Sequence, residues 1–373
     1  MLINTKEFKE VASAILLAVD ENAANLELVV KDDNLRLNVT NREYYVSKIF
    51  HLGEAEEFHA VVDAQLFLGL ISGITAETLE LSIKDNVVLI KAGKSKYKAP
   101  MIYENDTLAV LTPISVKNVT VSMGFPKDIM QSILNVNSKE LLKVKNLDVN
   151  PLQKLYYIDE TGCFTFTTGA TVNKFALEKP IKLLLNDKIV KLFRLFQTDA
   201  ILYYGVDASA DGSAQTKIVI STADTYLSAI INADDVLLND IQRPCAATKS
   251  YIDETYANHL VVSSTELSAA VARLMLFTKN RVANQNMRHI PATVAFTETE
   301  MSITDALDNT EVVGIEAGSY VDSAYSMVIN LADLKLVLDS CKNEHITINC
   351  GNHRSIIINR GAITNLLPES RMM

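Results

Sequence analysis

The sequence VVDAQLF at residues 61–67, followed by Leu70 and Ile71, reads as a strand end, a helix cap and the start of a helix. Apolar residues at helical spacing follow the polar residue Asp63. An aspartate oxygen can accept a hydrogen bond from a free N–H of the first helical turn, so Asp63 is a predicted N-cap. The stretch therefore predicts a strand that passes directly into an amphipathic helix.

Two later stretches repeat this pattern. Residues 184–190 read LLNDKIV, and residues 328–334 read VINLADL. The predicted caps are Asp63, Asn186 and Asn330, which lie 123 and 144 residues apart. Self-similarity at a nearly constant spacing indicates structural units in tandem.

A second type of helix start also recurs, after Thr5, Pro126 and Thr265. Each start precedes one of the strand–cap–helix stretches, so each unit contains two helices. The units run to roughly 120–140 residues, a usual domain size. The predicted domains are residues 1–115, 116–250 and 251–373.

Alternating apolar and polar residues surround a central turn in residues 25–37, 78–90 and 345–358. This pattern is typical of half-buried antiparallel hairpins joined by Asp, Asn or Gly. The units thus divide again into half-units, each with one helix against antiparallel strands. We predict an α+β protein of three similar domains, each with two helices packed on antiparallel sheets.

Composition narrows the class of protein. The 373 residues carry a net charge of −10, with 48% hydrophobic and 21% charged residues, so the chain folds and is not basic as a whole. It contains no run of 18 apolar residues, and its first residues lack a signal-peptide pattern. The four cysteines are far apart and favour buried, reduced thiols. We expect a soluble, cytoplasmic protein that does not enter a membrane.

Positive charge collects on the predicted helices of this acidic chain. In the fourth helix, near residues 187–197, Ile189, Leu192, Phe193 and Phe196 share one face and cations occupy the other. Such a face is either simply solvated or directed at a polyanion. The outward cations are Lys6, Lys9, Lys127, Lys188, Lys191, Arg194, Arg273 and Lys279.

Catalytic and cofactor motifs are missing from the sequence. It contains no glycine-rich dinucleotide motif, no phosphate loop and no nucleophile elbow, and its six histidines show no metal-ligand spacing on a helix. We therefore expect no cofactor and no metal, and a scaffold rather than an enzyme.

Residues 61–72, 79–81 and 90–98 resemble the first domain of the bacterial sliding clamp, the β subunit of DNA polymerase III. The three-unit length and the closing segment Leu366–Pro368 are similar too, and the divergence elsewhere fits a virally encoded member. The resemblance implies a homodimeric ring that encircles duplex DNA without sequence specificity. It also implies a clamp loader and a tethered replicative polymerase as partners, and assigns the helix cations to DNA.

The resemblance further implies two protein-binding sites. The family's partner-peptide pocket corresponds to Leu152, Thr167, Thr168, Gly169, Ala170, Val172, Pro244, Leu366, Leu367 and Pro368. The dimer interface corresponds to Leu276, Phe277, Lys96 and Leu108. Residues 168–174 lack the His-Arg pair usual in the family, and Leu276 and Phe277 also fit an ordinary core.

Two other functions stay open at this point. One is an adaptor with the clamp fold that binds peptides but does not encircle DNA. The other is an enzyme whose site has no recognised motif.

Overall fold

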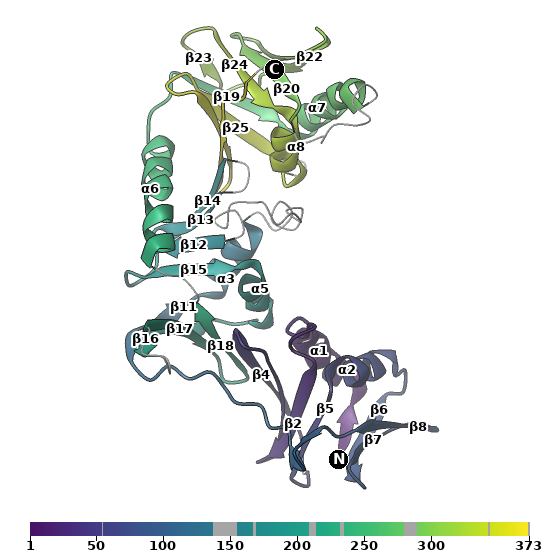
Figure 1. Ribbon diagram of the computed structural model, residues 1–373. Helices are drawn as coiled ribbons and strands as arrows, with labels where there is room; N and C mark the ends of the chain where they lie inside the picture. Colours follow the sequence, from purple (N-terminus) through teal and green to yellow (C-terminus); the bar gives the residue numbers. More distant parts are fainter. Residues whose placement is uncertain are drawn as a thin grey trace. The chain divides into compact units, whose positions relative to one another are not determined.

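The computed structural model describes residues 1–53, 55–136, 155–166, 169–208, 214–231, 235–279, 289–341 and 344–371. The chain forms two compact units, shown in Figure 1. Unit 1 comprises Met1–Leu134, Leu177–Ile181 and Lys188–Ala233, and unit 2 comprises Asn135–Ala176, Lys182–Asp187 and Asp234–Met373. Helices and antiparallel sheets make up both units, which confirms the predicted α+β class. The division into three domains stays a prediction.

An eight-stranded antiparallel sheet forms the centre of unit 1, in the order β11-β16-β17-β18-β4-β3-β2-β5. Strands from the start of the chain join later strands where β18 pairs with β4, with Leu227 opposite Val46. The strands are β2 (Asn25–Lys31), β3 (Asn34–Thr40), β4 (Tyr44–His51), β5 (Phe58–Asp63), β11 (Val119–Phe125), β16 (Ala200–Ala208), β17 (Ala214–Ser221) and β18 (Thr225–Ile231).

A second sheet of unit 1 has the order β1-β6-β7-β8. Its strands are β1 (Leu2–Asn4), β6 (Thr78–Lys84), β7 (Val87–Ala92) and β8 (Ser95–Pro100), and a separate small ribbon pairs β9 (Tyr103–Glu104) with β10 (Thr107–Leu108). The helices are α1 (Thr5–Leu16), α2 (Ala64–Gly73), α3 (Lys127–Asn135), α5 (Asp187–Leu192) and the 3₁₀ turn η2 (Phe193–Leu195). Helix α1 packs against α2, β3 and β4.

Unit 2 contains a nine-stranded sheet, β15-β12-β13-β14-β27-β26-β25-β19-β23, and a four-stranded sheet, β22-β21-β20-β24. The nine strands are β12 (Leu155–Asp159), β13 (Gly162–Thr165), β14 (Ala170–Lys174), β15 (Lys182–Asn186), β19 (Asn258–Ser263), β23 (Tyr320–Val321), β25 (His345–Cys350), β26 (Ser355–Arg360) and β27 (Ile363–Pro368). The four strands are β20 (Pro291–Phe296), β21 (Glu300–Asp305), β22 (Thr310–Gly314) and β24 (Tyr325–Asn330). The helices are α6 (Asp235–Ile252), α7 (Ser264–Lys279) and α8 (Leu331–Asp339).

Two of the three predicted caps, Asp63 and Asn330, and the predicted turn at residues 32–33 are confirmed. Asp63 Oδ1 accepts the N–H of Leu66 at 2.7 Å and so caps α2, and Asn330 caps α8 in the same way. Asp32 and Asp33, with φ of 51° and 57°, make the tight turn between β2 and β3. Both central residues of such a hairpin turn need positive φ, which aspartate and asparagine tolerate.

Two helices differ from the expectation. The fourth predicted helix, near residues 187–197, is shorter: α5 ends at Leu192 and continues only as the η2 turn. Helix α6, which crosses the predicted boundary after residue 250, was not predicted at all. It contains Pro244, a residue that normally argues against a helix interior.

Gly69 provides a test of the helix packing in unit 1. It lies inside α2, and a methyl group added there would meet no atom within 4 Å. Because glycine costs about 0.5–1 kcal/mol relative to alanine inside a helix, we expect Gly69→Ala to stabilise unit 1 by about that amount. Urea unfolding of the variant measures this, and a loss of stability would contradict the packing of α2.

Candidate functional site: helix cations, a sheet-edge groove and an apolar pair

The eight predicted DNA-binding cations fall into different environments. Lys6, Lys127 and Arg194 are exposed on α1, α3 and η2, and Lys9 is half-buried on α1. In the described part of the chain, no carboxylate forms an ion pair with any of these four. Their charge is therefore available to an external anion.

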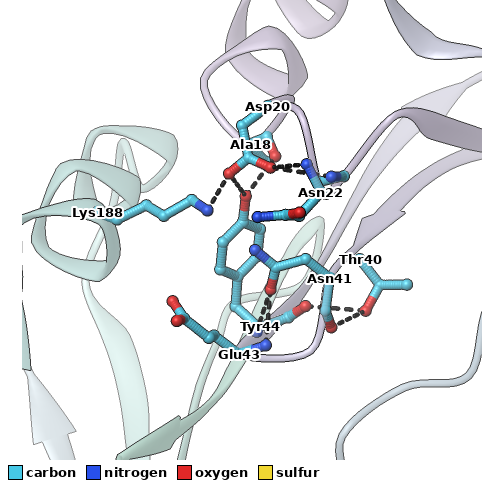
Figure 2. Close-up of polar contacts among 9 residues, drawn as sticks. Ala18, Asp20, Asn22, Thr40, Asn41, Glu43, Tyr44 and Lys188 are labelled. Carbon is cyan, nitrogen blue, oxygen red and sulfur yellow. Dashed lines mark hydrogen bonds and ion pairs between the residues drawn. The ribbon is translucent and has the colours of Figure 1, made fainter.

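Lys188 has a different role, which Figure 2 shows. Its ammonium forms an ion pair with Asp20 and lies 5.1 Å from the centre of the Tyr44 ring. The Tyr44 hydroxyl donates to the carbonyl of Ala18 at 2.6 Å and to Asp20 Oδ2 at 3.3 Å. The N–H of Asn22 donates to the other oxygen of Asp20 at 2.8 Å. Lys188 thus joins α5 to the loop after α1.

The ion pair alters the titration of Asp20. Burial alone would raise the pKa of this carboxyl, but the hydrogen bond from Lys188, the N–H groups of Asn22 and Ala23, and the Lys188 charge together lower it from its ordinary value of 3.8. A carboxyl with a lowered folded-state pKa contributes stability above its unfolded pKa and loses it as the pH falls. The contact therefore stabilises unit 1 at neutral pH and is lost in acid.

We expect Lys188→Met to lower the free energy of unfolding of unit 1 by more than it lowers the free energy of binding to any anion. An ion pair at this exposure is worth about 0.2–1 kcal/mol and the contact with the ring about 0.5–1 kcal/mol, so unit 1 should lose roughly 1–2 kcal/mol. Urea unfolding at pH 7 measures the loss, which should shrink as the pH falls below about 4 and Asp20 becomes protonated. Arg194→Met is the matched control, because no carboxylate pairs with Arg194 among the described residues. Equal stability of the two variants at pH 7 would contradict this role of Lys188.

The remaining three cations give weaker support for a DNA-binding role. Lys191 is half-buried on α5. Arg273 on α7 forms a bidentate pair with Glu311 on β22, at 2.7 and 2.6 Å. Lys279 ends α7, and its side chain lies outside the described residues.

Six of the predicted pocket residues lie at or next to the pairing of β14 with β27: Gly169, Ala170, Val172, Leu366, Leu367 and Pro368. Ala170 lies opposite Leu366 in this pair, and Gly169 is in direct contact with it. Gly169 has a φ of +80°, and a methyl group added there would lie 2.0 Å from the carbonyl oxygen of Leu366 and 3.0 Å from Pro368. Only glycine allows this close approach of the two chains.

Exposure divides these pocket residues. Pro368 is exposed and Leu366 is half-buried, so both can contact a partner, whereas Val172 and Leu367 are buried. Leu367 belongs to the apolar core of unit 2. Leu152, Thr167 and Thr168 lie outside the described residues.

Helix α6 is the element of this region that sequence reasoning missed. Lys249 on α6 bonds Asp159 at 2.7 Å and lies 5.2 Å from the centre of the Phe164 ring, and Asp253 just beyond α6 pairs with Lys174 at 2.6 Å. The helix is therefore attached to β12, β13 and β14, as Figure 1 also shows. Pro244, one of the predicted pocket residues, lies half-buried inside it. Ile241, Cys245 and Thr248 are buried on one face of α6, and their spacing of four and three residues was a helical signal available in the sequence.

The predicted dimer residues Leu276 and Phe277 are not core. Their exposed fractions are 59% and 52%, and they lie side by side in the chain near the end of α7. Helix α7 packs against β22, whose Val312 is 53% exposed. Leu276 and Phe277 are thus an exposed apolar pair, and exposed apolar residues that lie together are common at interaction surfaces. In unit 1, Lys96 is exposed on the edge strand β8, and Leu108 is half-buried on β10.

No group of three or more His, Cys, Asp or Glu among the described residues is placed to hold a metal ion. All four cysteines are buried, and burial raises the pKa of Cys245 and Cys350 to about 12, so neither is a nucleophile at neutral pH. No helix in the described ranges is long and apolar enough to span a membrane.

Comparison with solved structures identifies the fold. The chain is similar over 100% of both chains to the DNA polymerase III β subunit of Pseudomonas aeruginosa, with a TM-score of 0.75 and 14% identity. It is similar to the DNA polymerase III β subunit of Thermotoga maritima (TM-score 0.73, 15% identity) and to the Helicobacter pylori β clamp bound to a DNA ligase peptide (TM-score 0.69, 14% identity). In both cases the match covers 100% of this chain and 99% of the other. No family model and no curated protein sequence matches.

These observations define the fold of the chain as that of a DNA sliding clamp. This chain has the fold of the bacterial DNA polymerase III β subunits along its whole length, as its sequence predicted.

Proposed function

We propose that this protein is a DNA sliding clamp, a homodimeric ring that encircles duplex DNA and tethers the replicative polymerase without catalysing a reaction. The match to β clamps over the whole chain is the observation that carries the proposal. We further propose that each subunit contributes three domains, that a clamp loader places the ring on DNA, and that the protein acts in the cytoplasm.

The helix cations support the DNA part of the proposal. Lys6, Lys127 and Arg194 are exposed on helical elements of unit 1, although the chain as a whole carries −10. Cations that contact phosphates hold DNA without reading its sequence, and such binding weakens steeply with salt. Repulsion from the acidic remainder of the protein would discourage binding elsewhere.

Two sheet edges support ring closure. Among the described strands, β8 ends one sheet of unit 1 and β22 ends the four-stranded sheet of unit 2. Unpaired edges readily take another strand. We propose that β8 of each protomer pairs with β22 of the other, with Leu276 and Phe277 buried beside the joint. Such a head-to-tail contact made twice gives a closed twofold ring.

The surface at Leu366 and Pro368 supports the tethering part. An apolar half-buried residue next to an exposed proline suits a short apolar peptide. The Helicobacter pylori β clamp was solved with a DNA ligase peptide bound. We propose that the polymerase and other partners bind this chain through such peptides at the same surface.

Retention on DNA tests the proposal. After loading, the protein should stay on nicked circular duplex through gel filtration at high salt, and it should be lost when one cut linearises the circle, because enclosure and not affinity holds it. Equal loss from circular and linear DNA would contradict a ring and would favour the peptide-binding adaptor.

A charge variant tests which residues meet the DNA. We expect the combined substitution Lys6→Gln, Lys127→Gln and Arg194→Gln to flatten the dependence of log K on log salt by up to about 0.9 for each phosphate that the protein no longer neutralises. Fluorescence anisotropy with a short duplex measures this slope. The matched control is Lys31→Gln, Lys117→Gln and Lys182→Gln, three exposed lysines outside the helices. Equal slopes for the two variants would show that the helices do not face DNA.

A further inference from the structure

A cavity of about 230 Å³ lies on unit 1 where the turn between β17 and β18 meets β4. Ile49 of β4 lines its middle, because it lies opposite Arg36 of β3 and its N–H donates to the carbonyl of Asp224 in the turn at 2.8 Å. Tyr45 and Tyr226 also line it, and their rings meet edge to face with centroids 6.1 Å apart. None of these five residues belongs to the sites proposed above.

The cavity has one positive charge in excess. Arg36 is exposed, and no carboxylate of the described residues forms an ion pair with it. Asp224 is the one acid in the described lining, and it accepts the hydroxyl of Thr222 at 2.8 Å. Burial raises the pKa of Asp224, but its hydrogen bonds and the charge of Lys48 lower it overall from 3.8. Because Lys48 balances Asp224, the charge of Arg36 is left for an external anion.

Tyr45 adds a hydrogen-bond donor to this cation. Its side chain is 7% exposed. Burial, and then the charge of Glu27, raises the pKa of its hydroxyl, so the phenol keeps its proton at neutral pH. Glu27 itself is already bonded by His59 at 2.7 Å and by Asn38 at 2.8 Å. A guanidinium beside a hydroxyl donor suits a carboxylate, which accepts several hydrogen bonds at once.

The spacing of charge and apolar surface favours the end of a chain as the occupant. Side chains directly opposite in an antiparallel pair have Cβ atoms about 4.5–5.5 Å apart, so an anion on Arg36 and an apolar group on Ile49 must belong to nearly the same residue. The last residue of a chain carries its carboxylate and its side chain on one Cα. In an extended segment, an internal acid directs its neighbours to the opposite face. The volume equals roughly eight water molecules at about 30 Å³ each, which suits a single residue.

We propose that this cavity binds the C-terminal residue of a partner protein, with its carboxylate on Arg36 and Tyr45 and an apolar side chain on Ile49. The site lies wholly within unit 1 and contains no residue of the proposed ring contact, of the helix cations or of the surface at Leu366. It therefore does not depend on the proposed function, and the occupant is an additional partner.

Saturation-transfer NMR with the acetylated peptide Ser-Gly-Ser-Leu tests the proposal on the full chain, because the method detects the weak binding expected of so small a ligand. Amidation of the peptide's carboxyl end should weaken binding about tenfold, and Arg36→Gln should do the same, since each removes a charge-assisted hydrogen bond. The matched control is Arg42→Gln, an exposed arginine of unit 1 outside the cavity, which should bind as the unchanged protein does. Glycine in place of the peptide's leucine should weaken binding about threefold or more, because it buries no side chain on Ile49.

Three results would overturn the proposal. Equal affinity for the acid and the amide peptide, or equal binding by Arg36→Gln and Arg42→Gln, would mean that no carboxylate binds at Arg36. An amidated peptide with an internal glutamate that binds as tightly would make this a site for acidic side chains and not for chain ends. Inorganic phosphate or short duplex DNA that displaces the peptide as well as the peptide itself does would make it a general anion site. Arg36→Gln should leave retention on circular DNA unchanged, so failure of this proposal and failure of the ring are separate results.

Discussion

Replacing Leu276 and Phe277 by aspartate is expected to convert the proposed dimer into a monomer. Both side chains are more than half exposed in the single chain, so the substitution costs unit 2 little of its own packing. Burying each of them against a partner is worth about 1.5–3 kcal/mol. The variant loses the burial of both apolar side chains and places two carboxylates in the interface. The dissociation constant of the dimer should therefore rise by at least a hundredfold.

Light scattering across a dilution series measures this effect. The unchanged protein should give roughly twice the chain mass of 41.2 kDa, and the double variant should give the mass of one chain at the same concentrations. The matched control is Leu16→Asp with Leu66→Asp, two exposed leucines on α1 and α2. A dimer that survives Leu276→Asp and Phe277→Asp would place the interface elsewhere.

Gly169→Ala is expected to destabilise unit 2 and to remove the proposed peptide site. The added methyl group would lie 2.0 Å from the carbonyl oxygen of Leu366, at a φ of +80° that alanine disfavours. Left-handed backbone costs about 1–2 kcal/mol for a residue other than glycine, and overpacking costs about 1–3 kcal/mol. We expect a decrease of about 2–4 kcal/mol in the free energy of unfolding by urea, and no binding of apolar peptides that contact Leu366.

The two glycines Gly169 and Gly69 make a sharp comparison. The same substitution, glycine to alanine, should destabilise the protein at Gly169 and stabilise it at Gly69, where an added methyl group meets nothing within 4 Å. Gly169→Ala that unfolds like the unchanged protein would show that β14 and β27 do not approach as closely as described. Deletion of residues 366–373 is a poorer test of the site, because Leu367 is part of the core of unit 2.

Much of the local structure was readable from the sequence because its causes are local. The cap at Asp63 and the turn at Asp32 and Asp33 depend on residues that are neighbours in the chain. Helix α6 was missed because Pro244 argues against a helix, while the groups that attach α6, Asp159 and Phe164, are distant in the sequence. Tertiary contacts override a local preference in such a case.

The candidate sites show the same division. Charge and periodicity predicted the cations on the helices, yet Lys188 and Arg273 look like Arg194 in the sequence. Only the folded chain places Asp20 next to Lys188 and Glu311 next to Arg273, so both cations form ion pairs. Among the described residues, no carboxylate pairs with Arg194. Likewise, nothing local distinguishes an exposed Leu276 from a core leucine at the same helical spacing.

By itself the sequence determined the α+β class, the hairpin turns and the excess of cations on the helices, since these follow from residue types and short spacings. Tertiary structure alone decided the pairing of β14 with β27, the position of α6, the partners of the cations and the exposure of the apolar pair on α7. The physical reason is that burial and ion pairing depend on which distant segments meet, and that is settled only when the sheets assemble.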